Sequence, residues 1–201
     1  MDQTEAWRAI DAHRVNLTAL LDDLTADEWA RPSLCEGWTV RDVVGHLAFQ
    51  QSTLREQVKA TGVVRGGMNR IIHDSAVRYA RRPTGQLVGE VRALVGKHRP
   101  VRFTTYQESL IDVMVHSQDI VVPLGRTLPI PVEAAAGAAT RVWTIGWPWR
   151  ASRTFAGHRF VATDTDWSVG EGSAVEGPVA SILLLLTGRA VAVPTLAARL
   201  R

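Results

Sequence analysis

An aspartate and a histidine four residues apart stand in a strongly apolar stretch, "ESLIDVMVHSQD" at residues 108–119. Side chains four positions apart on an α-helix lie one turn above each other on the same face. Asp112 and His116 would therefore present a carboxylate oxygen and an imidazole nitrogen in one direction. Burial of such groups is costly unless they are paired or bound to a metal. The spacing fits either a metal site or a simple hydrogen-bonded pair.

His46 is the best candidate for a third metal ligand. It lies in "GWTVRDVVGHLAFQ" at residues 37–50, at the border of an apolar helical face, so it can point between helices. Two histidines and one carboxylate suit zinc or non-haem iron and leave a coordination position open. The alternative is that each histidine is a hydrogen-bonded residue of the core or its rim. Glu108 is two turns from His116, so both cannot bind one ion.

The remaining histidines and the single cysteine carry weaker signals. His13 lies on an apolar helical face and is expected to be a core histidine, with lining of the same pocket as the alternative. His73 is expected to be structural or exposed. Cys35 can form no internal disulfide, and no paired-cysteine metal site exists. We expect Cys35 to be a packed thiol in the turn before Trp38.

Composition limits the classes of function. The chain has 201 residues, 46% of them hydrophobic, and a formal net charge of +3. Its arginines are scattered and form no dense basic stripe, so nucleic-acid binding is not expected. The longest aliphatic run, residues 182–186, is far too short to cross a membrane. The acidic N-terminus lacks the apolar segment of a signal peptide, so a cytoplasmic protein is expected. The oligomeric state is not indicated.

Hydrophobic spacing predicts helices through the first two-thirds of the chain. Apolar residues recur every three or four positions from Trp7 to Leu24. Capping boxes at Thr25–Glu28 and Thr39–Asp42 predict two further helix starts, the second helix carrying apolar residues as far as Leu54. Later helices are expected over residues 68–81, 84–97 and 105–122, and a loop over residues 61–67. Long helices with short connections predict a bundle.

The pattern changes after Gly125. A small-residue helix is expected over residues 132–143, a hairpin over residues 158–172 and a buried helix that ends at Gly188. We therefore predict a mainly α chain, with a helical bundle over residues 1–126 and a small α+β domain over residues 127–201.

Three stretches together resemble a known family. "DEWARPSLCEGWTVRDVVGHLA" at residues 27–48 is similar to the opening signature of the mycothiol-dependent maleylpyruvate isomerases, which belong to the DinB-like metal enzymes. "ESLIDVMVHSQDIVVPLG" at residues 108–125 resembles their second metal-binding helix. "FVATDTDWSVGEGSAVEGPVASILLLLTGR" at residues 160–189 resembles the C-terminal half of related actinobacterial proteins.

This resemblance implies a DinB-like four-helix bundle, a small C-terminal domain and a metal site. In the family the metal is usually zinc, and the matching ligands here are His46, Asp112 and His116. The family usually has Glu where this chain has the shorter Asp112, which reaches the metal either directly or through water. Arg189, in the matching "LTGR" motif, is the candidate for binding an anionic substrate, with a surface role as the alternative. Asp119 is expected to orient His116 or to cap the helix end.

The implied activity uses mycothiol as a cosubstrate, with a small electrophile as the second substrate. A bound cation lowers the pKa of a thiol, and the thiolate attacks an electrophilic carbon. The enzyme would be an isomerase if the thiol leaves again, or an S-transferase if the adduct is the product. The alternative is a non-catalytic metal- and ligand-binding protein on the same scaffold. A regulator that associates through its tryptophan-rich C-terminal part is a third possibility.

Overall fold

The computed structural model describes residues 1–50, 67–100 and 104–200. Its chain forms two compact units, which are described separately. One contains residues 10–101 and 116–128, and the other contains residues 1–9, 102–115 and 129–201. Most of the predicted loop at residues 61–67, and the predicted helical position Leu54, lie outside the described residues.

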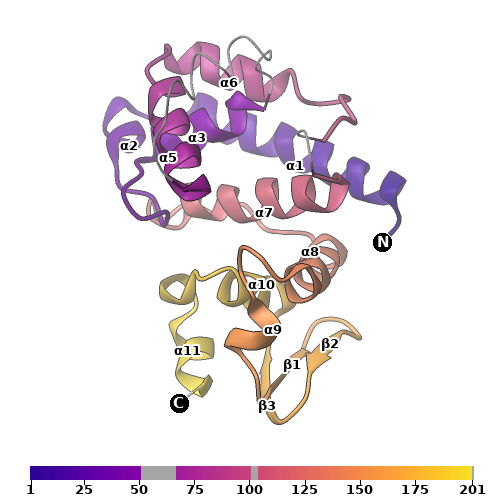
Figure 1. Cartoon of the computed structure of the whole chain (residues 1–201). Coiled ribbons are helices and arrows are strands. Elements are labelled where there is room, and N and C mark those ends of the chain that lie inside the picture. The colour runs from indigo at the N-terminus through magenta and orange to yellow at the C-terminus, as the bar shows by residue number, and fades with distance from the viewer. Residues whose placement is uncertain (51–66, 101–103, 201) are drawn as a thin grey trace. The chain divides into compact units, whose positions relative to one another are not determined.

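The first unit is helical, and Figure 1 shows its elements in indigo to pink. It holds most of α1 (Gln3–Asp22), then α2 (Ala26–Ala30), α3 (Val40–Phe49), α5 (Met68–Tyr79), α6 (Thr84–Arg92) and the last turns of α7 (Tyr106–Val121). Buried apolar side chains from all six helices form one continuous core, with Leu17, Val44, Leu87 and Ile120 among its members. Burial of apolar surface, which contributes about 25 cal/mol per Å², is the main force that holds these helices together.

Two capping boxes begin helices as the sequence predicts. The Thr25 hydroxyl accepts from the Glu28 backbone N–H, and the Glu28 carboxylate accepts from the Thr25 backbone N–H. Thr39 and Asp42 make the same reciprocal pair at the start of α3. Each cap satisfies two backbone donors that a helix start otherwise leaves unpaired. The second cap fixes where α3 begins and therefore where His46 lies along it.

Helix α3 packs closely against the end of α5 because residue 45 is glycine. A Cβ atom at Gly45 would lie 2.8 Å from the Ala80 Cβ and 2.9 Å from the Ala80 backbone. Any larger residue would push the two helices apart. The Arg41 side chain strengthens the same junction by donating to the backbone carbonyls of Ala80 and Arg82 at 2.6 and 2.7 Å.

Two helices end earlier than predicted. Helix α5 stops at Tyr79, two residues before the predicted end, and α6 stops at Arg92 although the pattern predicts helix to residue 97. The chain turns after α6, and Gly96 has a φ of +77°, a conformation that glycine adopts without steric cost. The Asp11 carboxylate holds this turn by accepting from the Gly96 N–H and from His98, both at 3.0 Å.

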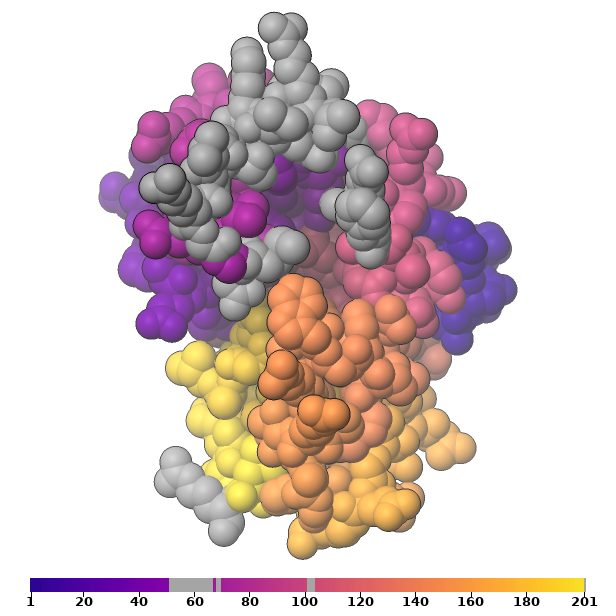
Figure 2. All heavy atoms as spheres, in the orientation of Figure 1, coloured from indigo at the N-terminus to yellow at the C-terminus, as the bar shows by residue number. Residues whose placement is uncertain are grey.

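The second unit combines helices with a small sheet. Its main elements are α8 (Val132–Ile145), α9 (Ala151–Thr154), β1 (His158–Ala162), β2 (Ser168–Gly170), β3 (Ser173–Gly177) and α10 (Val179–Leu186). Short turns follow: η1 (Ala190–Ala192), α11 (Pro194–Ala197) and η2 (Ala198–Leu200). Helix α10 packs against α8 and β1 (Figure 1). On the face shown in Figure 2, the orange segment around residues 146–155 lies at the surface, and its Trp147 is 55% exposed.

The sheet has the order β2-β1-β3. The predicted hairpin is confirmed, since β1 and β2 pair antiparallel with Phe160 opposite Val169. The sequence pattern did not predict β3, which pairs parallel to β1 with Phe160 opposite Val175. Phe160 and Val175 are almost fully buried, and the Phe160 ring packs edge-to-face against Trp143 and Phe155, so the central strand is covered.

The predicted fold class is confirmed: the chain is mainly α, with a DinB-like helical bundle and a small C-terminal α+β part. The domain boundary between residues 126 and 127 stays a prediction, because a compact unit need not be an independently folding domain. Within the parts of the chain that the structure describes, no helix has the length and apolarity needed to span a membrane.

Candidate metal centre

Helix α3 places His46 at the edge of its buried face. The residues around it on the helix, Val43, Val44 and Leu47, are buried in the core, whereas His46 is partly exposed. An imidazole at this border keeps one side against the core and can turn the other toward a ligand. This is the position that the apolar pattern of the helix predicts.

Helix α7 carries Asp112 and His116 one turn apart, as the four-residue spacing predicts. Both are partly exposed, although their helix neighbours Ile111, Val113 and Val115 are almost fully buried. The two polar side chains therefore lie on a partly exposed face of a helix that is otherwise mostly buried.

One donor atom from each of His46, Asp112 and His116 lies within 4.8 Å of the other two. Three donors that bind one zinc ion tetrahedrally at about 2.1 Å lie roughly 3.4 Å apart. The donor atoms must therefore approach one another by at most about 1.4 Å, which side-chain rotation provides. Two imidazole nitrogens and one carboxylate oxygen also match the donor types that zinc and non-haem iron prefer. The arrangement therefore fits a divalent cation.

Trp38 lies beside both histidines. Its ring centroid lies 5.4 Å from that of His46 and 6.2 Å from that of His116, and the two imidazoles are 4.8 Å apart. Trp38 is only 8% exposed. A large apolar side chain next to the donors lowers the local dielectric, which strengthens binding of a cation by charged ligands. His73, expected to be structural or exposed, also lies near this ring, at 6.1 Å, with its side chain 43% exposed.

Asp119 holds His116 in one orientation. Its Oδ2 lies 2.8 Å from His116 Nδ1, and the Asp119 side chain is completely buried. With the proton on Nδ1, the imidazole carries its lone pair on Nε2, which is the nitrogen that can bind an ion. Carboxylates that fix metal-binding histidines in this way are common in metalloproteins. The 2.8 Å contact supports an orienting role for Asp119, and that role stays a prediction.

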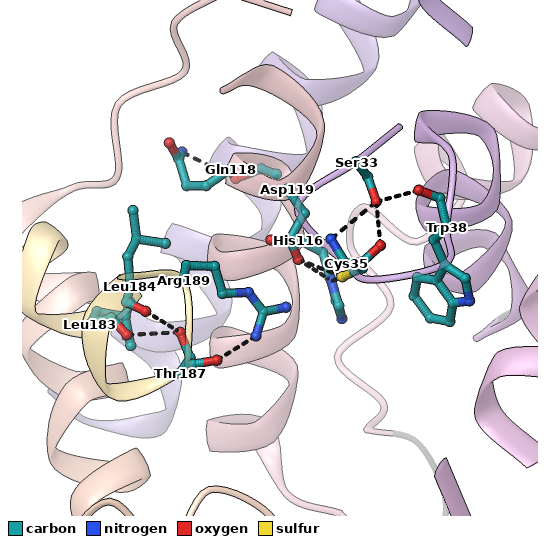
Figure 3. Close-up of polar contacts among 11 residues, drawn as sticks. Ser33, Cys35, Trp38, His116, Gln118, Asp119, Leu183, Leu184, Thr187 and Arg189 are labelled. Carbon is teal, nitrogen blue, oxygen red and sulfur yellow. Dashed lines mark hydrogen bonds and ion pairs between the residues drawn. The ribbon is translucent and has the colours of Figure 1, made fainter. Parts of the chain in front are cut away.

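Cys35 lies closer to this group than the sequence indicated. Its Sγ lies 3.0 Å from Asp119 Oδ2 and 3.7 Å from His116 Nδ1 (Figure 3). Sequence reasoning placed it only as a packed thiol. The signal that could have found it is its place in the same turn as Trp38, directly before the helix that carries His46.

Comparison with known proteins adds an independent result. Residues 10–95 match the sequence model of the mycothiol maleylpyruvate isomerase N-terminal domain. This segment contains the Cys35 turn, Trp38 and His46. Through this segment the chain is similar to the mycothiol-dependent maleylpyruvate isomerases.

Two solved structures share the fold of the chain. One is a mycothiol-dependent maleylpyruvate isomerase, with a TM-score of 0.62 and 16% sequence identity over 94% of this chain and 90% of that one. The other is a histidine-to-alanine mutant of a mycothiol-dependent maleylpyruvate isomerase, with a TM-score of 0.60 and 15% identity over the same shares. At this identity the likeness concerns the fold alone. No functionally curated protein matches the chain.

Arg189 is the residue that the sequence predicts to bind an anionic substrate, and this role stays a prediction. Arg189 follows α10 in the second unit, and its Nη1 donates to the Thr187 carbonyl oxygen at 2.6 Å (Figure 3). This bond folds the side chain back toward its own helix end. Binding of an anionic substrate by Arg189 would require the guanidinium to exchange or share this contact.

His13 has a structural role, as expected for a core histidine. It is 2% exposed, and its Nε2 lies 2.8 Å from the Ser117 hydroxyl. Burial lowers the pKa of His13 from 6.5 to about 4, because the charged form loses its hydration. The side chain is therefore neutral at physiological pH and joins α1 to α7 one residue beyond His116.

Proposed function

We propose that this chain is a metal-dependent, thiol-using enzyme of the cytoplasm, which takes mycothiol as cosubstrate and a small electrophile as substrate. The observation that carries the proposal is the convergence of His46, Asp112 and His116, within 4.8 Å of one another. The N-terminal domain match and the shared fold support mycothiol as the thiol. Zinc is the proposed metal, because two imidazoles and one carboxylate are a common donor set for catalytic zinc.

When bound, a divalent cation at this group would lower the pKa of the thiol and favour its thiolate, a stronger nucleophile. Three protein donors leave room for a fourth ligand from solvent or substrate. Asp119 keeps the Nε2 lone pair of His116 directed away from the carboxylate, since Nδ1 is held at 2.8 Å. Trp38 excludes water from one side of the two imidazoles. Arg189 is the proposed partner for a carboxylate of the electrophile.

Two reactions use the same steps up to the adduct. In an isomerase, the thiol sulfur forms a bond to one carbon of a cis double bond, and the neighbouring carbon takes up a proton. The resulting single bond rotates, and loss of the proton and thiol restores the double bond in the trans form. In an S-transferase, the carbon–sulfur bond stays in the product. The shape of the substrate pocket decides between them.

Thiol consumption tests the proposal and separates these outcomes. The zinc-loaded protein is incubated with mycothiol, with maleylpyruvate and, in parallel, with a panel of electrophiles. Isomerisation with a small catalytic amount of mycothiol identifies an isomerase, and stoichiometric loss of thiol identifies a transferase. His46→Ala should lower either rate at least about 100-fold, since it removes a ligand and not only a supporting contact. His98→Ala, a change at an exposed histidine, should leave the rate unchanged.

The competing function is binding of a metal and a small ligand without turnover. It would be favoured if zinc binds stoichiometrically while neither isomerisation nor loss of thiol occurs with any electrophile. The aspartate at position 112 favours this non-catalytic function, since the family that the chain resembles usually has the longer glutamate there. An Asp112→Glu variant tests that point directly, because gain of turnover would assign the missing activity to the shorter side chain.

A further inference from the structure

A second group of side chains that could bind a metal ion also includes His116. Cys35, His116 and Asp119 each offer a donor atom, and these atoms lie within 4.8 Å of one another. Their separations are 3.0 Å from Cys35 Sγ to Asp119 Oδ2, 2.8 Å from His116 Nδ1 to the same oxygen, and 3.7 Å from Sγ to Nδ1. This inner group contains His116 Nδ1, and the contact of Nδ1 with Asp119 leaves Nε2 as the nitrogen available to the outer group of His46, Asp112 and His116.

The turn that carries Cys35 is firmly held. The Ser33 hydroxyl accepts from the Cys35 backbone N–H at 3.1 Å and lies 2.9 Å from the Trp38 carbonyl oxygen (Figure 3). The Leu34 N–H donates to the Asp119 carbonyl at 3.2 Å, which ties the turn to α7. The thiol therefore reaches the imidazole and the carboxylate from a backbone that is already positioned, so little ordering is needed for binding.

The distances between the three donor atoms of the inner group are close to those in a tetrahedral metal site. With zinc–sulfur bonds of about 2.3 Å and zinc–nitrogen or zinc–oxygen bonds of about 2.1 Å, ligand atoms lie roughly 3.4 to 3.6 Å apart. The distance from Sγ to Nδ1 already agrees with this value. The two distances to Asp119 Oδ2 are shorter, because a thiol proton and an imidazole proton now occupy the space between the atoms. When a cation replaces these protons, the two distances to Asp119 Oδ2 should increase by about half an ångström.

We propose that Cys35, His116 and Asp119 form a second cation site, selective for soft, thiophilic divalent ions such as Cd²⁺. The thiolate of Cys35 makes the site softer than the group of His46, Asp112 and His116, which contains only nitrogen and oxygen donors. Binding releases the Cys35 proton to solvent and moves the His116 proton from Nδ1 to Nε2. Cys35 is partly exposed, which gives an ion a path to the buried carboxylate.

Occupation of the two groups is mutually antagonistic. A neutral imidazole has one nitrogen with a lone pair, so His116 cannot serve Nδ1 and Nε2 ligation together without losing a further proton. An ion in the inner group therefore weakens binding in the outer one. This antagonism rests on the proposed function of the outer group, whereas the existence of the inner site does not.

Cadmium titration of the whole chain tests the inner site. Cd²⁺ bound to a thiolate gives an ultraviolet charge-transfer absorption, and Cys35 is the single cysteine. The wild-type chain should develop this absorption up to one Cd²⁺ per chain. His46→Ala, which removes only the outer group, should retain it. Cys35→Ser, nearly isosteric, should lack it, and His116→Ala should weaken the binding that produces it by at least about 10-fold.

Each other outcome overturns the inference. Absence of the absorption in the wild-type chain shows that the thiol does not bind the ion. Its loss in His46→Ala places Cys35 with the outer ligands instead. An unchanged affinity in His116→Ala shows that the cysteine binds cadmium without the imidazole. Because His46→Ala lacks the outer group, its result does not depend on whether the chain is an enzyme, and circular dichroism of each variant verifies that it is folded.

Discussion

The two ends of α7 carry acidic side chains with different kinds of partner. Near its start, Glu108 accepts from Arg141 Nε at 2.6 Å and from the backbone and hydroxyl of Thr105 at 2.7 and 2.6 Å. Near its end, Asp119 is contacted by the His116 imidazole and the Cys35 thiol. The helix is continuous, so the difference comes from the partners and not from the backbone.

The partner decides whether an acid on this helix is structural or available for chemistry. A guanidinium stays protonated at all physiological pH values and cannot bind a metal, so the Glu108–Arg141 pair is a fixed contact. An imidazole and a thiol can each exchange a proton for a cation. At Glu108, burial acts to raise the pKa, but the bonds from Thr105 and Arg141 together lower it below its ordinary value. That carboxylate is therefore charged and paired near neutral pH.

Substitution of Asp112 should give the largest effect, on metal affinity. Asp112→Ala removes one of three donors and should weaken zinc binding by more than about 100-fold, beyond the loss usual for a supporting contact. Asp112→Glu should retain binding within about 10-fold, because the side chain keeps its carboxylate and is only one methylene longer. Glu108→Gln, on the same helix, is the matched control and should bind zinc as the wild type does. Isothermal titration calorimetry measures all three, and equal affinities of Asp112→Ala and the control would exclude Asp112 as a ligand.

Acid should destabilise the contact between α1 and α7 through His13. The folded chain holds His13 with a pKa of about 4 instead of 6.5, so only the unfolded chain binds the proton between these values. Stability is then complete above pH 6.5 and falls as the pH drops toward 4, by up to about 3 kcal/mol in total. Urea unfolding across this range measures the loss. His13→Gln should flatten this part of the curve, and an unchanged slope in that variant would assign the acid sensitivity to other groups.

Asp119→Asn should have a smaller effect on metal affinity than Asp112→Ala. The amide keeps the volume of the carboxylate but loses its charge, so it orients His116 less strongly. Loss of such supporting contacts lowers metal affinity by about 10- to 100-fold. Calorimetric titration with zinc measures the change, with the near-ultraviolet circular dichroism of the metal-free variant as a control for packing. An affinity equal to that of the wild type would show that Asp119 only supports the helix end.

Glu108→Gln should give the smallest effect, confined to stability. It replaces a partly buried ionic hydrogen bond with a neutral one, at a cost of about 1 kcal/mol in the free energy of unfolding. Because the pKa of Glu108 is lowered, its contribution is present above the ordinary carboxyl pKa and disappears as the pH falls through the folded value. Wild type and variant should therefore converge in stability in acid. A stability difference that stays constant with pH would contradict the charged pair.

Local signals in the sequence predicted much of the helical part. The capping boxes at Thr25 and Thr39 and the i,i+4 spacing of Asp112 and His116 depend on residues within one turn of each other, so pattern reasoning is sufficient. The convergence of His46 with this pair depends on helix packing, and resemblance to a family supplied it. Its role as a ligand stays a prediction, as do those of Asp112, His116 and Arg189.

Contacts between segments that are far apart in the chain were not predicted from the sequence. Cys35 reaches Asp119 across 84 residues because Leu34 bonds to the α7 backbone, and no local pattern encodes that bond. The parallel pairing of β3 with β1 is likewise non-local, since the strand between them in sequence lies on the other edge of the sheet. The early end of α6 depends on Asp11, which holds the following turn from another helix.

The most direct test of the metal centre is the number of zinc ions bound per chain, measured by elemental analysis after dialysis against limiting zinc. The wild type and His98→Ala should each hold one ion, whereas His116→Ala, and His46→Ala combined with Cys35→Ser to remove the inner group as well, should hold almost none. Stoichiometric zinc in both of these last variants would contradict the centre built on His46, Asp112 and His116.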